Sequence, residues 1–328
     1  MSRRVLVTGA AGFIGSHLQR GLPAAGWEVI GVDVRPTSDT VCGNRTEGLV
    51  GDAASPAVLA RISDGEFDAV LHQAAITDTL APDSTALQYA NVVTPLRLAD
   101  ACAQGGALFV YASSGSVYGA VTRGHRSRES DPGSAEHAGR PLNAYAWSKL
   151  TLDEAMFRRE GDLRWAGLRY TNVFGPGEQR KGPMASILSQ IVAAAAAGRP
   201  VRLFADTMTA ARDFIPVHAV TATVAAVLES PIPSGVYNLG AGTAIGFAEL
   251  LQWCAAWRGG DLTVQLVPNP IPDRYQYWTC TDQSALAAAL PDLPPITATE
   301  VRRAAAELFR SHQAAHAAPE STRPEEFS

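Results

Sequence analysis

The stretch Val5-Leu-Val-Thr-Gly-Ala-Ala-Gly-Phe-Ile-Gly-Ser-His17 decides the fold of this chain. Four apolar or β-branched residues run directly into glycines, and an apolar-periodic segment follows. This order indicates a buried strand, a tight turn and the start of a helix. Gly9 permits the turn, Gly12 lets a pyrophosphate approach the backbone, and Gly15 lets the helix pack against the strand. The free N–H groups at the helix start favour a phosphate.

A second expected strand, Glu28–Asp33, ends in an acid 18 residues after Gly15. A carboxylate at this place accepts hydrogen bonds from the ribose hydroxyls of an adenine dinucleotide. The two features together predict a dinucleotide site. An ordinary strand–helix–strand unit without a nucleotide is the alternative, because glycine-rich turns are common after strands.

The composition of the chain excludes several classes of protein. Its 328 residues, 46% of them hydrophobic, are enough for one large domain or two modest ones. The net charge is −5 without a long basic run, so we expect no nucleic-acid partner. The longest apolar runs are too short to span a membrane. Four dispersed cysteines and the lack of an apolar leader predict reduced thiols, no metal site and a cytoplasmic location.

Strand-like and helix-like segments alternate along the chain, which predicts a parallel sheet with helices on both faces. Small and polar residues at 73–78 follow the expected strand Phe67–His72, at the sheet edge that faces a cofactor. The polar, turn-rich segment Pro36–Gly51 is expected to be a loop. Residues 312–328 have little to bury and are expected to form a disordered tail.

The segment Tyr145-Ala-Trp-Ser-Lys149 places a phenol and an ammonium one turn apart on one helix face. A nearby ammonium favours the phenolate and lowers the pKa of the tyrosine, so Tyr145 is a candidate general base. Lys149 can also bind the ribose of a nicotinamide nucleotide. Ser114 lies at the end of another expected strand and can hydrogen-bond a substrate oxygen beside Tyr145. The alternative is an incidental surface pair of residues.

These motifs occur in a particular order along the chain. The order also includes Asn91, which lies between Asp33 and Ser114, and Arg169-Tyr-Thr-Asn-Val-Phe-Gly-Pro176, which follows Lys149. In this order the chain resembles the extended short-chain dehydrogenase/reductase family, whose members act on nucleotide sugars. The resemblance covers residues 3 to about 310. It implies an α/β fold with a Rossmann domain, a doubly wound parallel sheet, over residues 1–170. A smaller C-terminal α/β substrate domain would span residues 171–311, with segments that interleave with the first domain.

Within that family, the stretches that begin at Arg140, Lys181, Ala211 and Asp273 resemble the ADP-L-glycero-D-manno-heptose 6-epimerases. This likeness implies that Lys181 is a second acid/base, on the face of the sugar carbon opposite the tyrosine. Inverting a carbinol centre by oxidation and re-reduction requires hydride to leave one face and return to the other. Two opposed groups can then handle the hydroxyl proton. A solvated loop lysine or a phosphate contact is the alternative for Lys181.

The motifs and the resemblance together give three sets of site residues. The catalytic set is Ser114, Tyr145, Lys149 and Lys181. The cofactor set is Gly9, Gly12, Phe13, Ile14, Gly15, Asp33, Arg35, Asp52, Gln73, Ala74, Ala75, Asn91, Tyr145, Lys149 and Val173. The substrate set is Ser114, Asn172, Lys181, Gln190, Phe204, Arg212 and Tyr275. Arg212 suits a diphosphate because a guanidinium binds two oxygens at once, and a structural salt bridge to Asp213 or another acid is its alternative role.

The choice between NAD and NADP stays open. Asp33 favours NAD because an acid repels the 2′-phosphate, whereas Arg35 can pair with that phosphate. The resembling epimerases often use NADP with a similar acid in place. Because each turnover restores the cofactor, it should stay tightly bound. The expected partners are a nucleotide-diphosphate sugar, with ADP-heptose the leading candidate, and further copies of the chain in a homo-oligomer.

The leading hypothesis is a nucleotide-sugar epimerase that acts on ADP-heptose. The nearest alternative is a 4-epimerase or a 4,6-dehydratase of the same family. Dehydratases carry Asp-Glu after the small hydroxyl residue, where this chain has Gly115-Ser116. A non-catalytic dinucleotide-binding sensor is the alternative from another class. Such a protein could lack the tyrosine–lysine pair that this chain retains.

Overall fold

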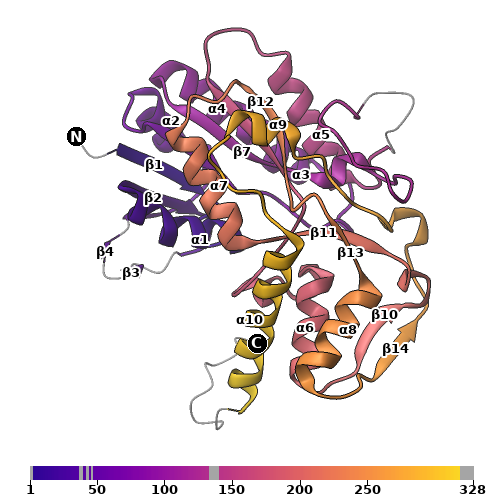
Figure 1. Cartoon of the computed structure of the whole chain (residues 1–328). Helices are drawn as coiled ribbons and strands as arrows, with labels where there is room; N and C mark the ends of the chain where they lie inside the picture. Colours follow the sequence, from indigo (N-terminus) through magenta and orange to yellow (C-terminus); the bar gives the residue numbers. More distant parts are fainter. Residues whose placement is uncertain (1–2, 37–39, 42–43, 46, 133–139, 318–328) are drawn as a thin grey trace.

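A computed structural model describes residues 3–36, 40–41, 44–45, 47–132 and 140–317. Its centre is a seven-stranded sheet in the order β5-β2-β1-β6-β7-β8-β12, in which every neighbouring pair is parallel (Figure 1). The predicted doubly wound parallel sheet is confirmed. These strands are β1 (Arg3–Thr8), β2 (Trp27–Asp33), β5 (Glu47–Val50), β6 (Ala69–His72), β7 (Leu108–Ser114), β8 (Trp165–Tyr170) and β12 (Gly235–Leu239).

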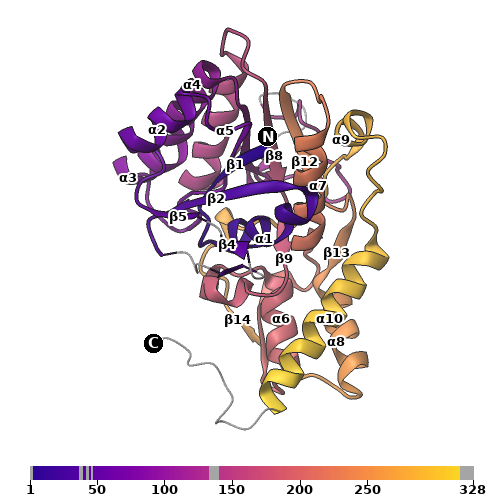
Figure 2. The same cartoon turned by 90° about the vertical axis from the view of Figure 1, so that its left-hand side faces the viewer.

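Helices cover both faces of this sheet (Figure 2). One face carries α1 (Phe13–Gly21), α7 (Val217–Glu229) and α9 (Ser284–Ala289). The other face carries α2 (Pro56–Ser63), α4 (Thr94–Gly105) and α5 (Ala144–Phe157). Four shorter elements lie between these strands and helices along the chain. They are the 3₁₀ turn Leu22–Ala25, α3 (Thr85–Gln88), a π-helical turn (Tyr89–Val93) and the 3₁₀ turn Gly115–Tyr118.

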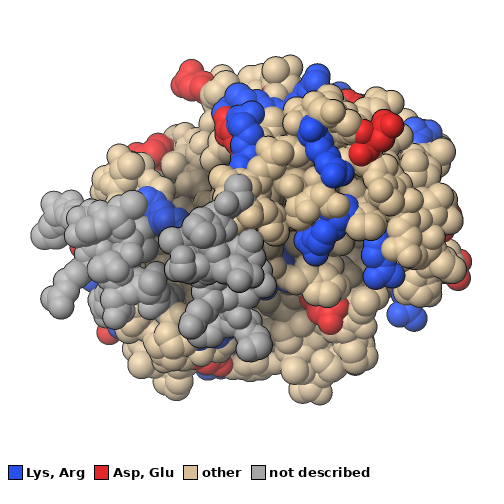
Figure 3. Space-filling view, turned by 90° about the horizontal axis from the view of Figure 1, so that it is seen from below, with Lys and Arg blue, Asp and Glu red and all other residues tan. Residues whose placement is uncertain are grey.

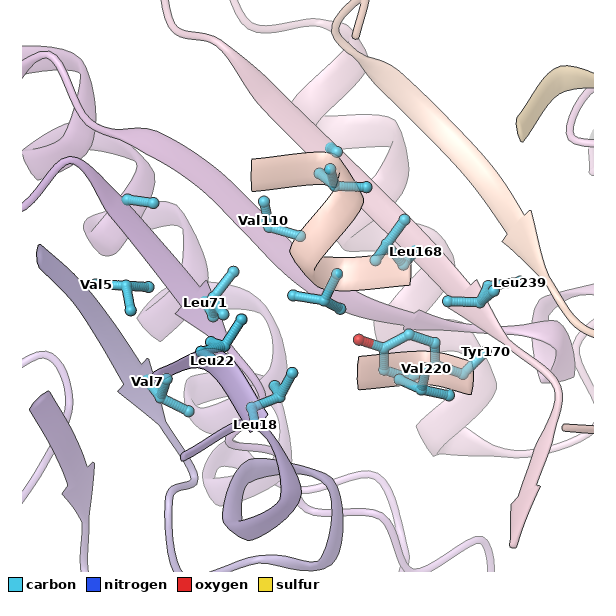
Figure 4. Close-up of a cluster of buried hydrophobic side chains, with 14 of the residues drawn as sticks. Val5, Val7, Leu18, Leu22, Leu71, Val110, Leu168, Tyr170, Val220 and Leu239 are labelled. Carbon is cyan, nitrogen blue, oxygen red and sulfur yellow. The ribbon is translucent and has the colours of Figure 1, made fainter. Parts of the chain in front are cut away.

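Alternation along the strands divides the sheet's apolar residues between two cores. Val5 and Val7 of β1 pack with Leu18 of α1 and Val220 of α7 (Figure 4). Leu6, which lies between them, belongs to the opposite core beneath α2, α4 and α5. Successive side chains of a strand point to opposite faces, so a strand buried on both sides reads as one continuous apolar run.

A smaller unit with its own apolar core lies beside the carboxyl ends of the central strands (Figure 1). Its core includes Leu188, Phe214, Phe247 and Phe309. The unit comprises β9 (Asn172–Phe174), 3₁₀ turn η4 (Glu178–Met184), α6 (Ile187–Ala196), β10 (Val201–Phe204), 3₁₀ turn η5 (Ala205–Thr207), β11 (Ala211–Pro216), β13 (Ala244–Gly246), α8 (Phe247–Arg258), β14 (Val264–Val267), 3₁₀ turn η6 (Pro272–Arg274) and α10 (Ala298–Ala317). The strand β12 pairs within the central sheet and α7 packs on one of its faces, although both follow β11 of the smaller unit along the chain. The two units therefore interleave in sequence.

Two expectations about irregular segments need correction. Within the expected loop, residues 47–50 form β5, which pairs with β2, and β3 (Thr40–Val41) pairs with β4 (Asn44–Arg45). An edge strand of this kind gives a weak apolar signal, since Val50 is 65% exposed. Residues 312–317 belong to α10, because an alanine-rich run extends a helix that Leu308 and Phe309 anchor. Residues 318–328 of the expected tail lie outside the described residues.

The surface seen in Figure 3 carries basic and acidic side chains that are scattered among uncharged residues. Within the part of the chain that the structure describes, none of the helices combines the length and apolar character needed to cross a bilayer. Cys102, Cys254 and Cys280 are buried free thiols, and Cys42 lies outside the described residues. The homo-oligomer and the cytoplasmic location stay predictions.

Candidate active site

The glycine turn between β1 and α1 is closed by backbone contacts. Gly9 has a φ of 66°, and a Cβ there would lie 2.6 Å from the backbone nitrogen of Ala74. A Cβ on Gly15 would lie 2.1 Å from the Gly9 carbonyl oxygen, so only glycine lets α1 start this close to the turn. No side chain caps α1, whose first N–H groups are therefore available to a phosphate.

Asp33 holds this turn against the end of β2. Its carboxylate accepts hydrogen bonds from the backbone N–H groups of Ala11, at 3.0 Å, and Arg35, at 2.9 Å. The Arg35 side chain is 68% exposed and lies 3.6 Å from the same carboxylate. Asp52 accepts a hydrogen bond from the Tyr89 hydroxyl at 3.1 Å. Asp33, Arg35 and Asp52 all line one cavity of about 850 Å³.

A second cavity, of about 400 Å³, adjoins the first along the carboxyl ends of the strands. The two cavities form one cleft, because they share the lining residues Phe13, Ile14, Gln73, Ala75, Thr77 and Lys181. The predicted residues that line the smaller cavity are Phe13, Ile14, Gln73, Ala75, Ser114, Tyr145, Lys149, Asn172, Val173, Lys181, Arg212 and Tyr275. Those that line the larger one are Gly9, Gly12, Phe13, Ile14, Gly15, Asp33, Arg35, Asp52, Gln73, Ala74, Ala75 and Lys181.

A dinucleotide fits the donors of this cleft. The Gln73 side chain lies in both cavities, and its Nε2 is buried without a hydrogen-bond partner among the described residues. The Tyr170 hydroxyl donates to Gln73 Oε1 at 3.2 Å, which fixes the amide so that Nε2 remains the free donor. A buried donor without a partner is costly, so a bound polar ligand would relieve that cost.

Tyr145 stands in the first turn of α5, beside the end of β7. Asn143 caps this helix, because its side-chain oxygen accepts a hydrogen bond from the N–H of Ala146 at 2.9 Å. Ser114, the last residue of β7, forms a hydrogen bond with Tyr145. The Ser114 hydroxyl also accepts from the Ser116 N–H at 3.1 Å. The helix cap and the strand end therefore fix the phenol in the smaller cavity.

The pKa of Tyr145 differs from the expectation. Burial raises it above its ordinary value, and the hydrogen bond with Ser114 opposes that rise. The Nζ of Lys149 lies 5.9 Å from the centre of the Tyr145 ring and donates to the Ala112 carbonyl at 2.8 Å. The lysine is thus directed past the phenol, and the expected lowering of the Tyr145 pKa by Lys149 is wrong for this geometry.

Lys149 itself is buried, with 1% of its surface exposed. Burial lowers the pKa of Lys149 to about 8, and the negative charge of Asp153 opposes that effect. His72 lies on the neighbouring strand β6 and shares a hydrogen bond of 2.8 Å with Thr8. Burial and then the charge of Lys149 lower the pKa of His72 to about 3, so this imidazole is neutral near pH 7.

Lys181 reaches the cleft from η4, which contains glycine in a left-handed conformation at 182 (φ 55°). Its Nζ lies 3.5 Å from Glu178 Oε1 and 5.9 Å from the centre of the Phe13 ring. The buried Glu178 carboxylate also accepts from the Ser186 N–H at 2.7 Å and from the Ser189 hydroxyl at 2.5 Å. Glu178 therefore connects the segment of Lys181 to the start of α6.

Arg212 supplies a guanidinium to the smaller cavity. The group lies 4.9 Å from the ring centre of Tyr275, to which it is hydrogen-bonded, and its Nε is buried without a partner. The alternative salt bridge to Asp213 does not form. The Asp213 carboxylate instead accepts from the Ala241 N–H at 2.8 Å and from the Thr281 hydroxyl at 2.6 Å.

Three predicted site residues do not line the cleft. The amide of Asn91 is used within the protein, since its oxygen accepts from Ile76 N–H at 2.9 Å and its nitrogen donates to the Ser148 hydroxyl at 3.0 Å. Gln190 donates to the Ala185 carbonyl at 2.8 Å and lines a separate surface cavity. Phe204 packs edge-on against the cleft residue Tyr275, with ring centres 5.7 Å apart, so it contacts a lining residue without lining the cleft itself.

Two features of the site were missed from the sequence. Glu178 stands three residues before Lys181, a helical spacing that could have indicated a contact. Arg169 lies in a buried strand, where a charged residue requires a partner, and that partner is Asp153. Among the described residues, no cluster of three or more histidine, cysteine, aspartate or glutamate side chains has the arrangement of a metal site.

Comparison with known proteins gives the family. A model of the NAD dependent epimerase/dehydratase family matches residues 5–240. The chain belongs to this family. The ADP-L-glycero-D-manno-heptose-6-epimerase of Cupriavidus pinatubonensis is 33% identical to it over 313 residues, which cover 87% of this chain and 92% of that protein.

Solved structures give the same result. The ADP-L-glycero-D-manno-heptose-6-epimerase of Helicobacter pylori aligns with a TM-score of 0.80 at 27% identity and covers 95% of this chain and 96% of that one. The UDP-glucose 4-epimerase of Thermus thermophilus, in complex with NAD, aligns with a TM-score of 0.75 at 30% identity, over 94% and 99% of the two chains. The predicted family, the nicotinamide cofactor and the class of nucleotide-sugar epimerase are confirmed.

Proposed function

We propose that this chain is an ADP-glycero-manno-heptose 6-epimerase, which inverts C6 of its substrate through a ketone. The observation that carries the proposal is that Tyr145 and Lys181 line the same small cavity. They come from different elements, α5 and η4, so a sugar carbon can lie between them. The similarity to two heptose epimerases supports the choice of sugar.

The two acid/base groups perform complementary roles. A secondary alcohol loses its hydroxyl proton to a base as hydride leaves the carbon, and the ketone oxygen takes up a proton when hydride returns. Because the hydroxyl points to opposite sides in the two epimers, one of the two groups serves each orientation. Tyr145, with Ser114 hydrogen-bonded to it, serves one side, and Lys181 serves the other.

The remaining cleft residues bind and orient. The nicotinamide dinucleotide supplies, when bound, the acceptor and the donor of the hydride. Lys149 would hold its ribose, and the turn of Gly9, Gly12 and Gly15 with the uncapped start of α1 would hold its pyrophosphate. Arg212 would bind the diphosphate of the sugar nucleotide, since its guanidinium is buried and makes no ion pair within the described residues.

The proposal is tested by proton NMR of ADP-D-glycero-D-manno-heptose incubated with the purified protein and no added cofactor. The expected result is conversion to the L-glycero epimer until the two forms reach equilibrium. The nucleotide released by denaturing the same sample identifies the cofactor as NAD or NADP. Parallel incubations with UDP-glucose test the alternative 4-epimerase, and turnover of that substrate alone would contradict the proposal.

A further inference from the structure

The helix face that carries Tyr145 and Lys149 continues into a third polar residue, Asp153. The three residues are successive neighbours at i, i+4 and i+8, so they lie along one side of α5. Asp153 is 1% exposed, and none of the roles described above requires it. Burying a carboxylate is costly, and replacing a buried ion pair by apolar residues is often neutral or stabilising. Its presence here therefore calls for an explanation beyond stability.

Three donors from the sheet hold the Asp153 carboxylate. The Tyr111 hydroxyl donates to it at 3.0 Å and the Ser113 hydroxyl at 2.9 Å, both from β7. The Arg169 Nε of β8 donates at 2.8 Å and forms a buried ion pair with it. Burial raises the pKa of Tyr111 well above its ordinary value, so this phenol remains a donor. Asp153 is thus the point at which α5 is attached to two central strands.

The attachment extends to the wall of the cleft. The Nη1 of Arg169 donates to the Tyr118 hydroxyl at 3.1 Å and to the Glu129 carbonyl at 2.9 Å. The Tyr118 hydroxyl in turn donates to Asn238 Oδ1 at 2.5 Å, and Tyr118 lines the smaller cavity. A movement of Asp153 would therefore shift both the helix of the acid/base pair and a wall of the substrate site.

The charges around Lys149 are few. The groups that act on it are Tyr145 and Asp153 on α5, neutral His72 on β6 and the Ala112 carbonyl on β7. Tyr111 of β7 and Arg169 of β8 contact Asp153 in turn. Among these described groups, Asp153 supplies the negative charge: it forms an ion pair with Arg169, and it raises the pKa of Lys149. The positive charge of Arg169 partly offsets the carboxylate charge that acts on Lys149.

We propose that Asp153 is a positioning residue for the reaction: held by Arg169, it fixes the catalytic face of α5 against β7 and keeps Lys149 charged. The proposal rests on the assignment of Tyr145 and Lys149 to the proposed epimerisation. It makes no use of the identity of the sugar. It goes beyond the tyrosine–lysine pair because it makes the charge of that pair depend on a residue that does not line the cleft.

The direction of the electrostatic effect follows from the charges. Burial alone lowers the pKa of Lys149, and Asp153 opposes this. Asp153→Asn removes the opposing charge, so the pKa of Lys149 falls below its value of about 8 in the unaltered chain. Arg169→Met removes the positive charge that offsets the carboxylate, so the pKa rises. A helix that merely loosens would admit water and raise the pKa of Lys149 in both variants, because burial would be relieved.

The composition of the chain makes this measurement direct. Only two of its residues are lysines, Lys149 and Lys181, against 25 arginines. Protein labelled with ¹³C at the lysine ε-carbon therefore gives two side-chain signals, which Lys181→Met assigns. A pH titration of the Lys149 signal, at equal content of bound nucleotide, should give a pKa lower by roughly one unit in Asp153→Asn and higher in Arg169→Met. An unchanged pKa, or a rise in both variants, would overturn the proposal.

Two controls isolate the charge of Asp153. Tyr111→Phe removes a hydrogen bond to the same carboxylate and keeps its charge, so the Lys149 pKa should stay within a few tenths of a unit, a shift far below that expected of a lost neighbouring charge. Asp153→Glu retains the charge and should restore most of the wild-type pKa. The neutral variant of Asp153 is the decisive one, because the proposal predicts a fall in the Lys149 pKa where a loosened helix predicts a rise. If Asp153→Asn fails to fold, Asp153→Ser removes the same charge and takes its place. The titration needs no substrate, so a failure of the ADP-heptose assay would leave it interpretable.

Discussion

The two lysines of this chain are held in opposite ways. Lys149 lies on a helix with 1% of its surface exposed, its Nζ bound to a carbonyl and its positive charge favoured by a buried carboxylate. The side chain of Lys181 is 35% exposed and extends from a 3₁₀ segment that contains a left-handed glycine. The difference indicates that the first lysine keeps a fixed position and charge. The second can follow a sugar carbon that presents its hydroxyl first on one side and then on the other.

The largest effect on turnover should come from Tyr145, which lies on the same helix as the buried Lys149. Tyr145→Phe removes the hydroxyl that exchanges a proton with the substrate, so turnover should fall by about 10³-fold, within the usual range for an acid/base group. Bound nucleotide, measured by absorbance after denaturation, should be unchanged. Tyr237→Phe is the matched control, because Tyr237 lies in β12, outside the cleft, and its hydroxyl donates to the Pro233 carbonyl. Equal activity of the two variants would contradict the role of Tyr145.

The next effect concerns the exposed lysine. Lys181→Met should lower turnover by about 10²-fold, since one of two acid/base groups is lost. Lys181→Arg separates the possible roles. A guanidinium does not give up its proton in proteins, so arginine cannot replace an acid/base lysine, although it can replace a phosphate contact. If Lys181→Arg retains wild-type turnover, Lys181 binds phosphate and the comparison between the two lysines fails.

Arg212 should affect binding more than chemistry. Arg212→Met is expected to raise KM for the ADP-sugar by about 10- to 100-fold, the equivalent of one lost charge-assisted hydrogen bond of roughly 1.5–3 kcal/mol. Turnover at saturation should change by only a few-fold. Initial rates over a range of ADP-sugar concentrations measure both quantities. A fall in turnover with an unchanged KM would show that Arg212 acts on the reacting carbon instead.

The smallest effect tests the backbone that carries Lys181. Gly182 has a φ of 55°, and a Cβ there meets nothing within 4 Å, so Gly182→Ala imposes conformational strain without a clash. Gly182 also has a ψ of −127°, and a side chain held in such a sparsely populated backbone region costs about 1–3 kcal/mol, which should disturb the segment and lower turnover a few-fold. Gly260→Ala is the control, since its Cβ also meets nothing within 4 Å and it has no left-handed conformation. Equal turnover of the two variants would mean that the position of Lys181 does not depend on this turn.

The parts of the site that depend on local spacing could be predicted from the sequence. The glycine turn follows from three glycines after an apolar run, and Tyr145 and Lys149 share a helix face because they are four residues apart. The ion pair of Asp153 and Arg169 joins a helix to a strand, and no spacing along the chain indicates such a contact. The pKa of Tyr145 likewise depends on burial, which a sequence motif does not report.

Two residues assigned to the site by resemblance do not line the cleft, because the protein uses their polar side chains internally. Asn91 and Gln190 belong to stretches expected at the site, yet nearby backbone groups use their amides. The edge strand β5 was not predicted from the sequence for a different reason. It pairs on one side only and exposes Val50, so neither an apolar run nor a clean alternation marks it.

The central claim is that this cleft inverts a carbinol carbon by removing and returning the same hydrogen. The most direct measurement uses ADP-heptose deuterated at C6, incubated in ordinary water with the purified protein and no added nucleotide. The account predicts that the L-glycero product retains its deuterium at C6, because the hydrogen never exchanges with solvent. Epimerisation with loss of the deuterium to water would contradict the account, since it would indicate proton abstraction from carbon.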